Sequence, residues 1–189
     1  EAVDFVVGRQ AAAGIDIIGW SDVTDDERVE LDAWFDERVF PVLTPLAVDP
    51  GHPFPYISDL ALSLAVNVAD PETGDRRFAR LKVPKLFPRL VLVSTGRYLP
   101  VEQLIAAKLD RLFVGMIIED WAPFRVSRNA DLTLEEEEAD DLLEAVEMEL
   151  RRRRFNKAVR LEVSHDIGAE VLELLVRELE LSMDDVTFH

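Results

Sequence analysis

The densest group of side chains that could do chemistry is a basic cluster in the last quarter of the chain. Its members are Arg151, Arg152, Arg153, Arg154, Lys157 and Arg160. Arginine binds phosphate or carboxylate oxygens through two parallel hydrogen bonds. Helix ion pairs explain part of the run, because Glu147 and Glu149 lie four residues before Arg151 and Arg153. The cluster therefore predicts one of three roles: contact with a phosphate polyanion, an interface with another domain or subunit, or a solvated helix end.

An acidic run, residues 135–138 with Asp140 and Asp141, lies just before this cluster. Carboxylates can hold a hard cation, but this run lacks the glycine turn and the ligand spacing of a calcium loop. It precedes a predicted helix, whose positive end acidic groups complement. We therefore expect a structural role for the run, and no metal site.

The three histidines, His52, His165 and His189, stand in no recognisable catalytic or metal-binding pattern. We expect surface or capping roles for each of them. The sequence also has no glycine-rich loop that could cradle a nucleotide phosphate. The residues themselves therefore predict no catalytic centre in this chain.

Composition narrows the class of protein further. The formal charge is −17, which opposes binding to nucleic acid or to an anionic membrane unless a local basic patch exists. The chain has no cysteine, and the longest apolar stretch, residues 60–68, is too short to span a membrane. The chain starts without a methionine or a signal peptide, and both ends fall inside predicted elements, so we expect a piece of a longer protein.

Hydrophobic periodicity predicts helices over residues 2–13, 101–112, 139–154 and 167–179. A further helix is expected to begin after Thr24, which forms a capping box with Glu27, and to end at Pro41. Predicted strands cover residues 15–18, 60–68, 77–83, 90–93, 98–99, 116–121, 124–127, 131–134, 159–163 and 186–188.

Strands and helices do not alternate strictly, so the predicted fold class is α+β. We expect a mixed, mainly antiparallel sheet with hairpins, packed against several amphipathic helices. Residues 60–68 and 77–83 are predicted to form one hairpin and residues 90–93 and 98–99 another. The proline-rich segment 40–58 is predicted to be an extended, rigid connection.

A series of strings occurs in the order FPVLTPLAVDP, HPFPYISDLALSLAV, RFARLKVP, GRYLPVEQLIAAKLDRLF, FRVSRNADL, RRRRFNKAVRLEV and EVLELLVRELEL. In this order they resemble the region after the N-terminal domain in bacterial polyphosphate kinases of the long, multidomain type. In that family an N-terminal helical domain is followed by a head (middle) domain and two related C-terminal domains. The resemblance implies that residues 1–13 are the end of the N-terminal helical domain and residues 14–189 the head domain.

The family makes inorganic polyphosphate from ATP, reversibly, through a phosphorylated histidine. That histidine and most nucleotide contacts belong to the C-terminal domains, so no catalytic residue carries over to this chain. ATP and Mg²⁺ are implied for the parent enzyme, and no cofactor is expected on this segment. The implied role of the head domain is dimerisation and shaping of the active-site region.

The expected partners are the remaining domains of the enzyme, a second copy in a dimer or tetramer, and polyphosphate as a candidate ligand; nucleic acid is not expected. The resemblance implies a cytoplasmic protein, either free or peripheral to the membrane within the full enzyme. Val114 and Asn156 depart from the family pattern, which has proline and glycine there. The alternative is therefore a non-enzymatic interaction or oligomerisation module of a divergent paralogue.

Overall fold

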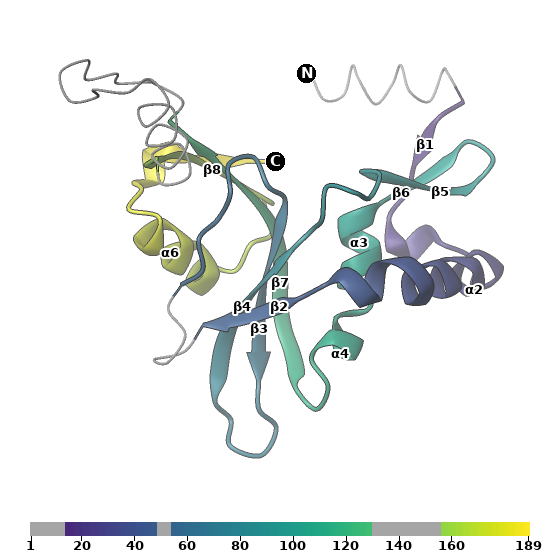
Figure 1. Cartoon of the computed structure of the whole chain (residues 1–189), viewed down its shortest axis with the longest axis horizontal. Helices are drawn as coiled ribbons and strands as arrows, with labels where there is room; N and C mark the ends of the chain where they lie inside the picture. The colour runs from purple at the N-terminus through teal and green to yellow at the C-terminus, as the bar shows by residue number, and fades with distance from the viewer. Residues whose placement is uncertain (1–13, 49–53, 130–155) are drawn as a thin grey trace, which may run out of the picture.

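The computed structural model describes residues 14–48, 54–129 and 156–189. Over these residues the chain forms two β-sheets with helices packed against them (Figure 1), which confirms the predicted α+β class. The helices predicted over 2–13 and 139–154, and the strand predicted over 131–134, lie outside the described residues.

The larger sheet has six strands among the described residues. In spatial order they are β2 (Pro45–Val48), β4 (Arg76–Lys82), β3 (Ser63–Ala69), β7 (Ile117–Arg128), β8 (Ala158–Val163) and β9 (Val186–Phe188). Neighbouring strands are antiparallel except β8 and β9, which run parallel. The predicted hairpin is confirmed as β3 and β4. Asp70 stabilises its turn by accepting hydrogen bonds from the backbone N–H groups of Glu72 (2.8 Å) and Thr73 (3.2 Å).

Two predictions about prolines were wrong. The segment predicted as a connection contains a short 3-10 helix, η3 (Phe40–Val42), and the edge strand β2, which begins at Pro45. An edge strand tolerates proline because one side of it needs no donor. The strands predicted over 116–121 and 124–127 are the single strand β7, which runs through Pro123. Pairing with β8 begins at Phe124, so Pro123 lies where β7 is paired only with β3.

The smaller sheet consists of β1 (Asp16–Ile17), β6 (Arg97–Pro100) and β5 (Leu90–Ser94), in that order. The predicted second hairpin is confirmed as β5 and β6. Gly96 in its turn has φ +77°, and a Cβ there would lie 2.5 Å from the carbonyl oxygen of Gly14. Only glycine fits this position without a shift of the chain.

The capping box of α2 (Asp25–Trp34) is confirmed: Thr24 N–H donates to the Glu27 carboxylate, and Glu27 N–H donates to the Thr24 hydroxyl. The helix continues as a π-turn, η2 (Phe35–Val39), which buries Phe35 and Val39 completely. A 3-10 turn, η1 (Trp20–Asp22), precedes α2.

The helix predicted over 101–112 is divided into α3 (Val101–Ala106) and α4 (Leu109–Leu112). The break falls at Lys108, whose ammonium group lies 2.6 Å from Asp32 and whose backbone leaves helical geometry with φ −123°. The helix predicted over 167–179 is α6 (Ala169–Glu178), and η4 (Met183–Asp185) leads into β9. Among the described residues, 14–48, 54–129 and 156–189, no helix combines the length and the apolar character that a membrane crossing requires.

Two hydrophobic cores lie on opposite faces of the larger sheet. Leu64 and Val66 of β3 belong to the first core, which the smaller sheet, α2, α3 and α4 cover. Ala65 of β3 and Phe124 of β7 belong to the second core, which α6 covers. Figure 1 shows these two groups of elements on either side of the larger sheet. Because alternate residues of a strand point to opposite faces, β3 is buried on both sides.

Candidate functional site

The predicted basic cluster falls mainly on residues that lie outside the described ranges. Arg151, Arg152, Arg153 and Arg154 belong to this part, as do the acidic run at 135–141 and His52. Lys157 is exposed just before β8, and its carbonyl oxygen accepts a hydrogen bond from Asn129 N–H at 3.0 Å. Arg160 is exposed on β8 opposite Ser127. The role of this cluster therefore stays a prediction.

The two described histidines take part in local packing near the end of the chain. The ring of His165 stacks on Phe188 with 5.8 Å between centroids, and its backbone N–H donates to the carbonyl oxygen of His189. No group of His, Asp and Glu side chains within 14–48, 54–129 or 156–189 converges as a metal site would. The geometry therefore gives neither described histidine a metal-binding neighbourhood.

Two positions that depart from the expected family pattern have clear structural settings. Val114 lies in the exposed turn after α4, beside Gly115, whose φ is +81°. Asn156 is held on both sides, because its amide donates to Asn129 O at 2.6 Å and its carbonyl oxygen accepts from Arg128 at 2.6 Å. Asn156, at a position where glycine is expected, therefore anchors the start of the final segment.

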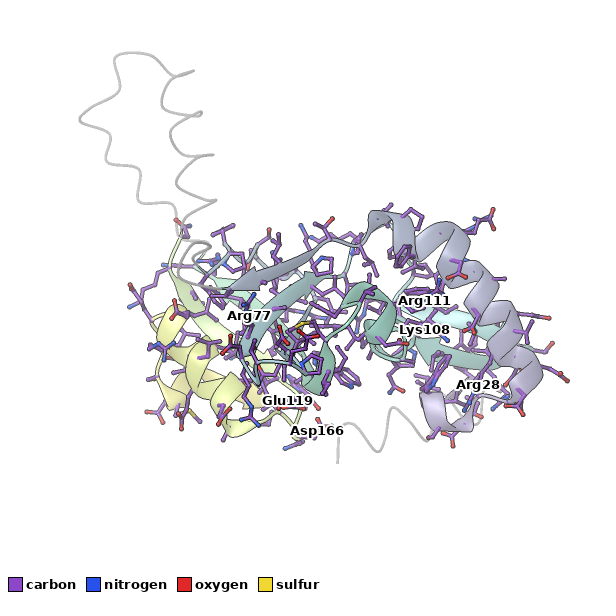
Figure 2. The ribbon with its side chains drawn as sticks, turned by 90° about the horizontal axis from the view of Figure 1, so that it is seen from below. Arg28, Arg77, Lys108, Arg111, Glu119 and Asp166 are labelled. Atoms are coloured by element: carbon purple, nitrogen blue, oxygen red, sulfur yellow. The ribbon has the colours of Figure 1, made fainter. Side chains whose placement is uncertain are left out.

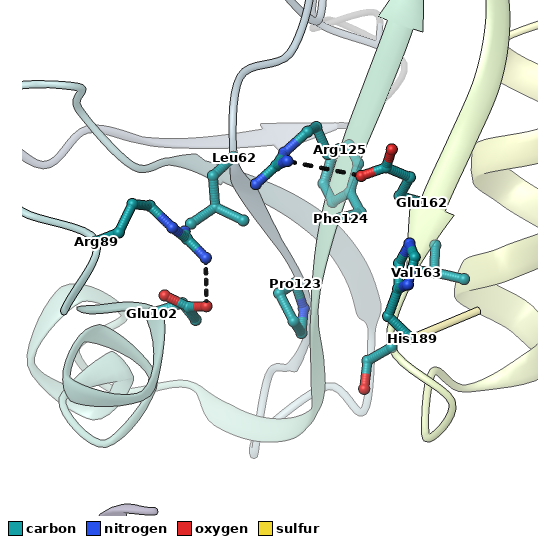
Figure 3. Close-up of a pocket in the computed structure, with 10 residues that line it drawn as sticks. Leu62, Arg89, Glu102, Pro123, Phe124, Arg125, Glu162, Val163 and His189 are labelled. Atoms are coloured by element: carbon teal, nitrogen blue, oxygen red, sulfur yellow. Dashed lines mark hydrogen bonds and ion pairs between the residues drawn. The ribbon is translucent and has the colours of Figure 1, made fainter. Parts of the chain in front are cut away.

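A first hollow, of about 420 Å³, lies where α3 faces β7 and β8 (Figure 3). We call it the balanced groove; it is lined by Leu62, Arg89, Glu102, Pro123, Phe124, Arg125, Glu162, Val163, Ser164 and His189. Arg125 and Glu162 are directly opposite each other on β7 and β8. Glu102 comes from the first turn of α3, and Arg89 precedes β5.

Each arginine of the balanced groove has a carboxylate partner. Arg89 Nη2 lies 2.8 Å from Glu102 Oε1, and Arg125 Nη1 lies 3.7 Å from Glu162 Oε2, as the dashed lines in Figure 3 show. The first pair links the chain before β5 to α3, and the second links the neighbouring strands β7 and β8. Both arginines of this groove therefore lie beside a carboxylate that offsets their charge.

A second hollow, of about 470 Å³, lies beside the edge strand β2. We call it the basic groove; it is lined by Val42, Thr44, Leu46, Arg80, Lys82, Pro84 and Lys85. Arg80 and Lys82 are two residues apart on β4 and so share one face of the sheet. Lys82 is opposite Ser63, which is opposite Phe124, so this is the face that carries the second core.

No acidic residue lines the basic groove, so its lining does not neutralise the positive charges there. Arg80 is only 5% exposed, and its hydrogen bonds go to neutral oxygens, those of the Ser63 hydroxyl at 3.3 Å and the Tyr56 carbonyl at 3.4 Å. Its Nη2 is buried and finds no acceptor among the described residues. Burial lowers the pKa of Arg80 from its ordinary value, because desolvation penalises the charged form.

Sequence reasoning missed the basic groove, although RFARLKVP contains two of its cations. A signal was present in the alternation of β4: the sheet buries Phe78, and the same face two residues later carries Arg80. A cation at a position that periodicity assigns to the core is unusual and indicates a function. Residues from β2 complete the groove, however, and their segment was predicted to be a connection.

Figure 2 shows Arg28, Lys108 and Arg111 at the helical end of the molecule, away from Arg77, Glu119 and Asp166. The cations of Arg28 and Lys108 lie 5.5 Å and 5.2 Å from the centre of the Trp20 ring. Lys108 also pairs with Asp32, and Arg111 pairs with Asp36. These basic groups are engaged by the protein itself, so they hold α2 and α4 together.

Glu27 connects α2 to the smaller sheet. Its carboxylate accepts hydrogen bonds from Thr24 N–H, from the Ser94 hydroxyl at 2.8 Å and from Arg97. These bonds, with the backbone bond from Thr24 first, lower its pKa from 4.5 to about 2. Glu27 therefore stays ionised and is a structural group.

A model of the family described as polyphosphate kinase middle domain matches residues 26–188. The chain is 53% identical over 176 residues to a polyphosphate kinase of Streptomyces coelicolor, covering 93% of this chain and 24% of that protein. It is 50% identical over 191 residues to one of Mycolicibacterium gilvum, covering 97% of this chain and 26% of that protein. The chain thus spans about a quarter of the length of these relatives.

The fold also matches a solved structure. The crystal structure of polyphosphate kinase from Porphyromonas gingivalis superposes with a TM-score of 0.73 over 98% of this chain and 26% of that one. Sequence identity is 23%, so this match supports the fold alone.

Proposed function

Because this chain belongs to the polyphosphate kinase middle-domain family, we propose that it is the head domain of an enzyme that reversibly transfers the γ-phosphate of ATP to inorganic polyphosphate. The observation that carries the proposal is 53% identity over 93% of the chain with a polyphosphate kinase. The activity, and the ATP and Mg²⁺ it requires, belong to the parent enzyme. We assign residues 14–189 to the head domain and residues 1–13 to the end of the N-terminal helical domain.

Within that enzyme, we propose that this domain serves assembly and the shaping of the active-site region. Support comes from the outer face of the smaller sheet, where Leu92 is opposite Tyr98 and Tyr98 is opposite Ile17. Leu92 is 60% exposed and Ile17 is 41% exposed, while Val91 and Val93 point into the first core. A row of apolar side chains across three strands is typical of a surface that another protein surface covers.

The activity is tested on the full-length enzyme. We expect purified protein with ATP and Mg²⁺ to form acid-insoluble polyphosphate, and to form ATP from polyphosphate and ADP. Absence of transfer in both directions, from a folded protein, would favour the non-enzymatic module of a divergent paralogue. Measurement in both directions matters because reversibility is part of the proposal.

The assembly role is tested by light scattering on the same enzyme. We expect the wild type to be a homo-oligomer and Leu92→Glu to shift it toward smaller species, because a buried carboxylate at an interface is costly. Val29→Glu, on the 70% exposed Val29 of α2, is the matched control and should leave the mass unchanged. Unchanged assembly of the folded Leu92 variant would contradict this role for the smaller sheet.

In the cell, we propose that the enzyme works in the cytoplasm, free or peripheral to the membrane. The basic cluster at Arg151–Arg154, Lys157 and Arg160 remains a candidate contact for polyphosphate or for a neighbouring subunit. Its test is replacement of the four arginines by alanine in the full-length enzyme. Loss of polyphosphate affinity would assign the cluster to the ligand, and loss of assembly would assign it to the interface.

A further inference from the structure

The starting observation is a buried guanidinium group without a counter-charge. Arg80 is 5% exposed, and none of the residues that line the basic groove with it is acidic. Its two hydrogen bonds, at 3.3 Å and 3.4 Å, are longer than usual N–H···O bonds. An uncompensated buried charge is expensive, so we expect an anion from outside these residues to stabilise it.

Two lysines stand at the rim of the same groove. Lys82 and Lys85 are exposed, and neither forms an ion pair with a carboxylate in the described part of the chain. Three cations therefore surround one hollow in a protein whose formal charge is −17. Lys108 and Arg111, by contrast, each pair with a carboxylate of α2 or η2.

The remaining lining residues indicate which oxyanion fits. Thr44 supplies a hydroxyl group, and Val42, Leu46 and Pro84 supply apolar walls beside the cations. No aromatic ring lines the groove, so nothing is placed to stack on a nucleobase. A chain of phosphates without a base meets these conditions better than a nucleotide does.

We propose that the basic groove is a binding site for phosphate groups of inorganic polyphosphate, with Lys82 and Lys85 as direct contacts and Arg80 as the fixed charge behind them. This inference rests on the proposed function. It deepens that function, because it gives the head domain a place on the path of the polymer. The groove is lined in part by β4, and none of Arg151–Arg154 is among its lining residues.

The test uses the full-length enzyme and a short-chain polyphosphate as the probe. We expect Lys82→Gln with Lys85→Gln to weaken polyphosphate binding about tenfold or more, because two charge-assisted contacts are lost. The slope of the logarithm of the binding constant against the logarithm of the salt concentration should become shallower by about 1.4, at about 0.7 per neutralised phosphate on a flexible polyanion. Lys82→Arg with Lys85→Arg should restore binding.

A matched control separates a site from the general effect of charge. Arg38→Gln with Arg77→Gln also removes two exposed positive charges, and neither residue lines the basic groove. We expect this variant to bind polyphosphate like the wild type. Equal weakening in both double variants would overturn the proposal, and so would unchanged binding in the lysine variant.

The KM for ATP shows whether the groove binds the phosphates of polyphosphate or those of ATP. In the lysine variant we expect this KM to stay within about twofold of the wild-type value, a change of less than about 0.5 kcal/mol. A selective rise in the KM for ATP would assign the groove to the nucleotide and overturn the proposal. If the wild type makes and binds polyphosphate while the lysine variant does so equally well, only this inference fails. If the wild type neither makes nor binds polyphosphate, the proposed function fails and the inference fails with it.

Discussion

The two grooves contain similar side chains but treat charge in opposite ways. In the balanced groove Arg89 and Arg125 each have a glutamate partner on a neighbouring element. In the basic groove Arg80, Lys82 and Lys85 have no carboxylate partner among the lining residues. Arg125 and Glu162 each follow a residue of the second core in the sequence, and successive residues of a strand point to opposite faces of the sheet. They therefore lie on the face of the larger sheet opposite to that of Arg80.

In this fold, structural and functional charges differ in whether the protein itself neutralises them. Charges that the protein neutralises itself connect elements, so their loss should lower stability. Charges that the protein leaves uncompensated impose a cost on folding, so their loss should raise stability while it weakens binding. The sign of a stability change therefore reports the role of a charge.

The largest effects should come from the cores beneath the grooves, and they test whether the two sides fold together. Phe35→Ala in the first core and Phe124→Ala in the second should each lower the free energy of unfolding by about 3–5 kcal/mol. Both rings are almost fully buried, at 0% and 1% exposure.

Because β3 contributes to both cores, urea denaturation should remain one transition in each variant, followed by circular dichroism and by tryptophan fluorescence. Two separate transitions, with Phe124→Ala affecting only one, would show that the faces of the sheet are independent units.

In each groove, the replacement of one charged side chain should change the free energy of unfolding with a different sign. Glu102→Gln should lower the free energy of unfolding by about 1 kcal/mol, because Arg89 loses its 2.8 Å partner. Arg80→Met should leave it unchanged or raise it by about 1 kcal/mol, because an apolar side chain of similar length replaces an uncompensated charge. Denaturant titration of both variants gives the comparison. A loss of stability in Arg80→Met as large as that in Glu102→Gln would remove the distinction between the grooves.

Acid titration tests another charge that the protein neutralises itself, the Glu27 carboxylate between α2 and the smaller sheet. The pKa of Glu27 is lowered from 4.5 to about 2, so its ionised form stabilises the fold above about pH 4.5. This contribution should disappear as the pH falls from about 4.5 to about 2. The difference in unfolding free energy between wild type and Glu27→Gln should therefore shrink over that range. Glu30→Gln on the same helix is the control, and an equal pH dependence in both variants would contradict the role of Glu27.

The smallest stability effect is expected at the rim of the basic groove. Lys82→Gln with Lys85→Gln should raise the free energy of unfolding by a few tenths of a kcal/mol, since exposed like charges repel weakly. Thermal denaturation at low salt should show the increase, and high salt should remove it. A decrease at low salt would show that the lysines have partners in the folded protein.

The sequence alone predicts the elements whose causes are local. The Thr24 capping box, the hairpin of β3 and β4 and the α+β class are confirmed, because turn residues and alternation decide them. The strand β2 and the continuity of β7 through Pro123 were missed, since a distant partner strand decides where proline is tolerated. The break at Lys108 was also missed, since Lys108 contacts Asp32 of a distant helix, which no pattern within residues 101–112 reveals.

The candidate site was predicted less well than the fold for the same reason. The alternation of β4 places Arg80 on a core-facing position, but only the structure shows that its partners are the neutral oxygens of Ser63 and Tyr56. Consecutive arginines are conspicuous in a sequence, whereas the lack of a counter-charge beside a buried arginine is evident only in a structure.

The most direct measurement is a crystal or cryo-microscopy structure of the full-length enzyme with polyphosphate bound. We expect a phosphate group in the basic groove, within hydrogen-bond distance of Lys82 or Lys85 and close to the guanidinium group of Arg80. An ordered polyphosphate chain that passes elsewhere, with the groove empty or filled by a carboxylate of another domain, would contradict it.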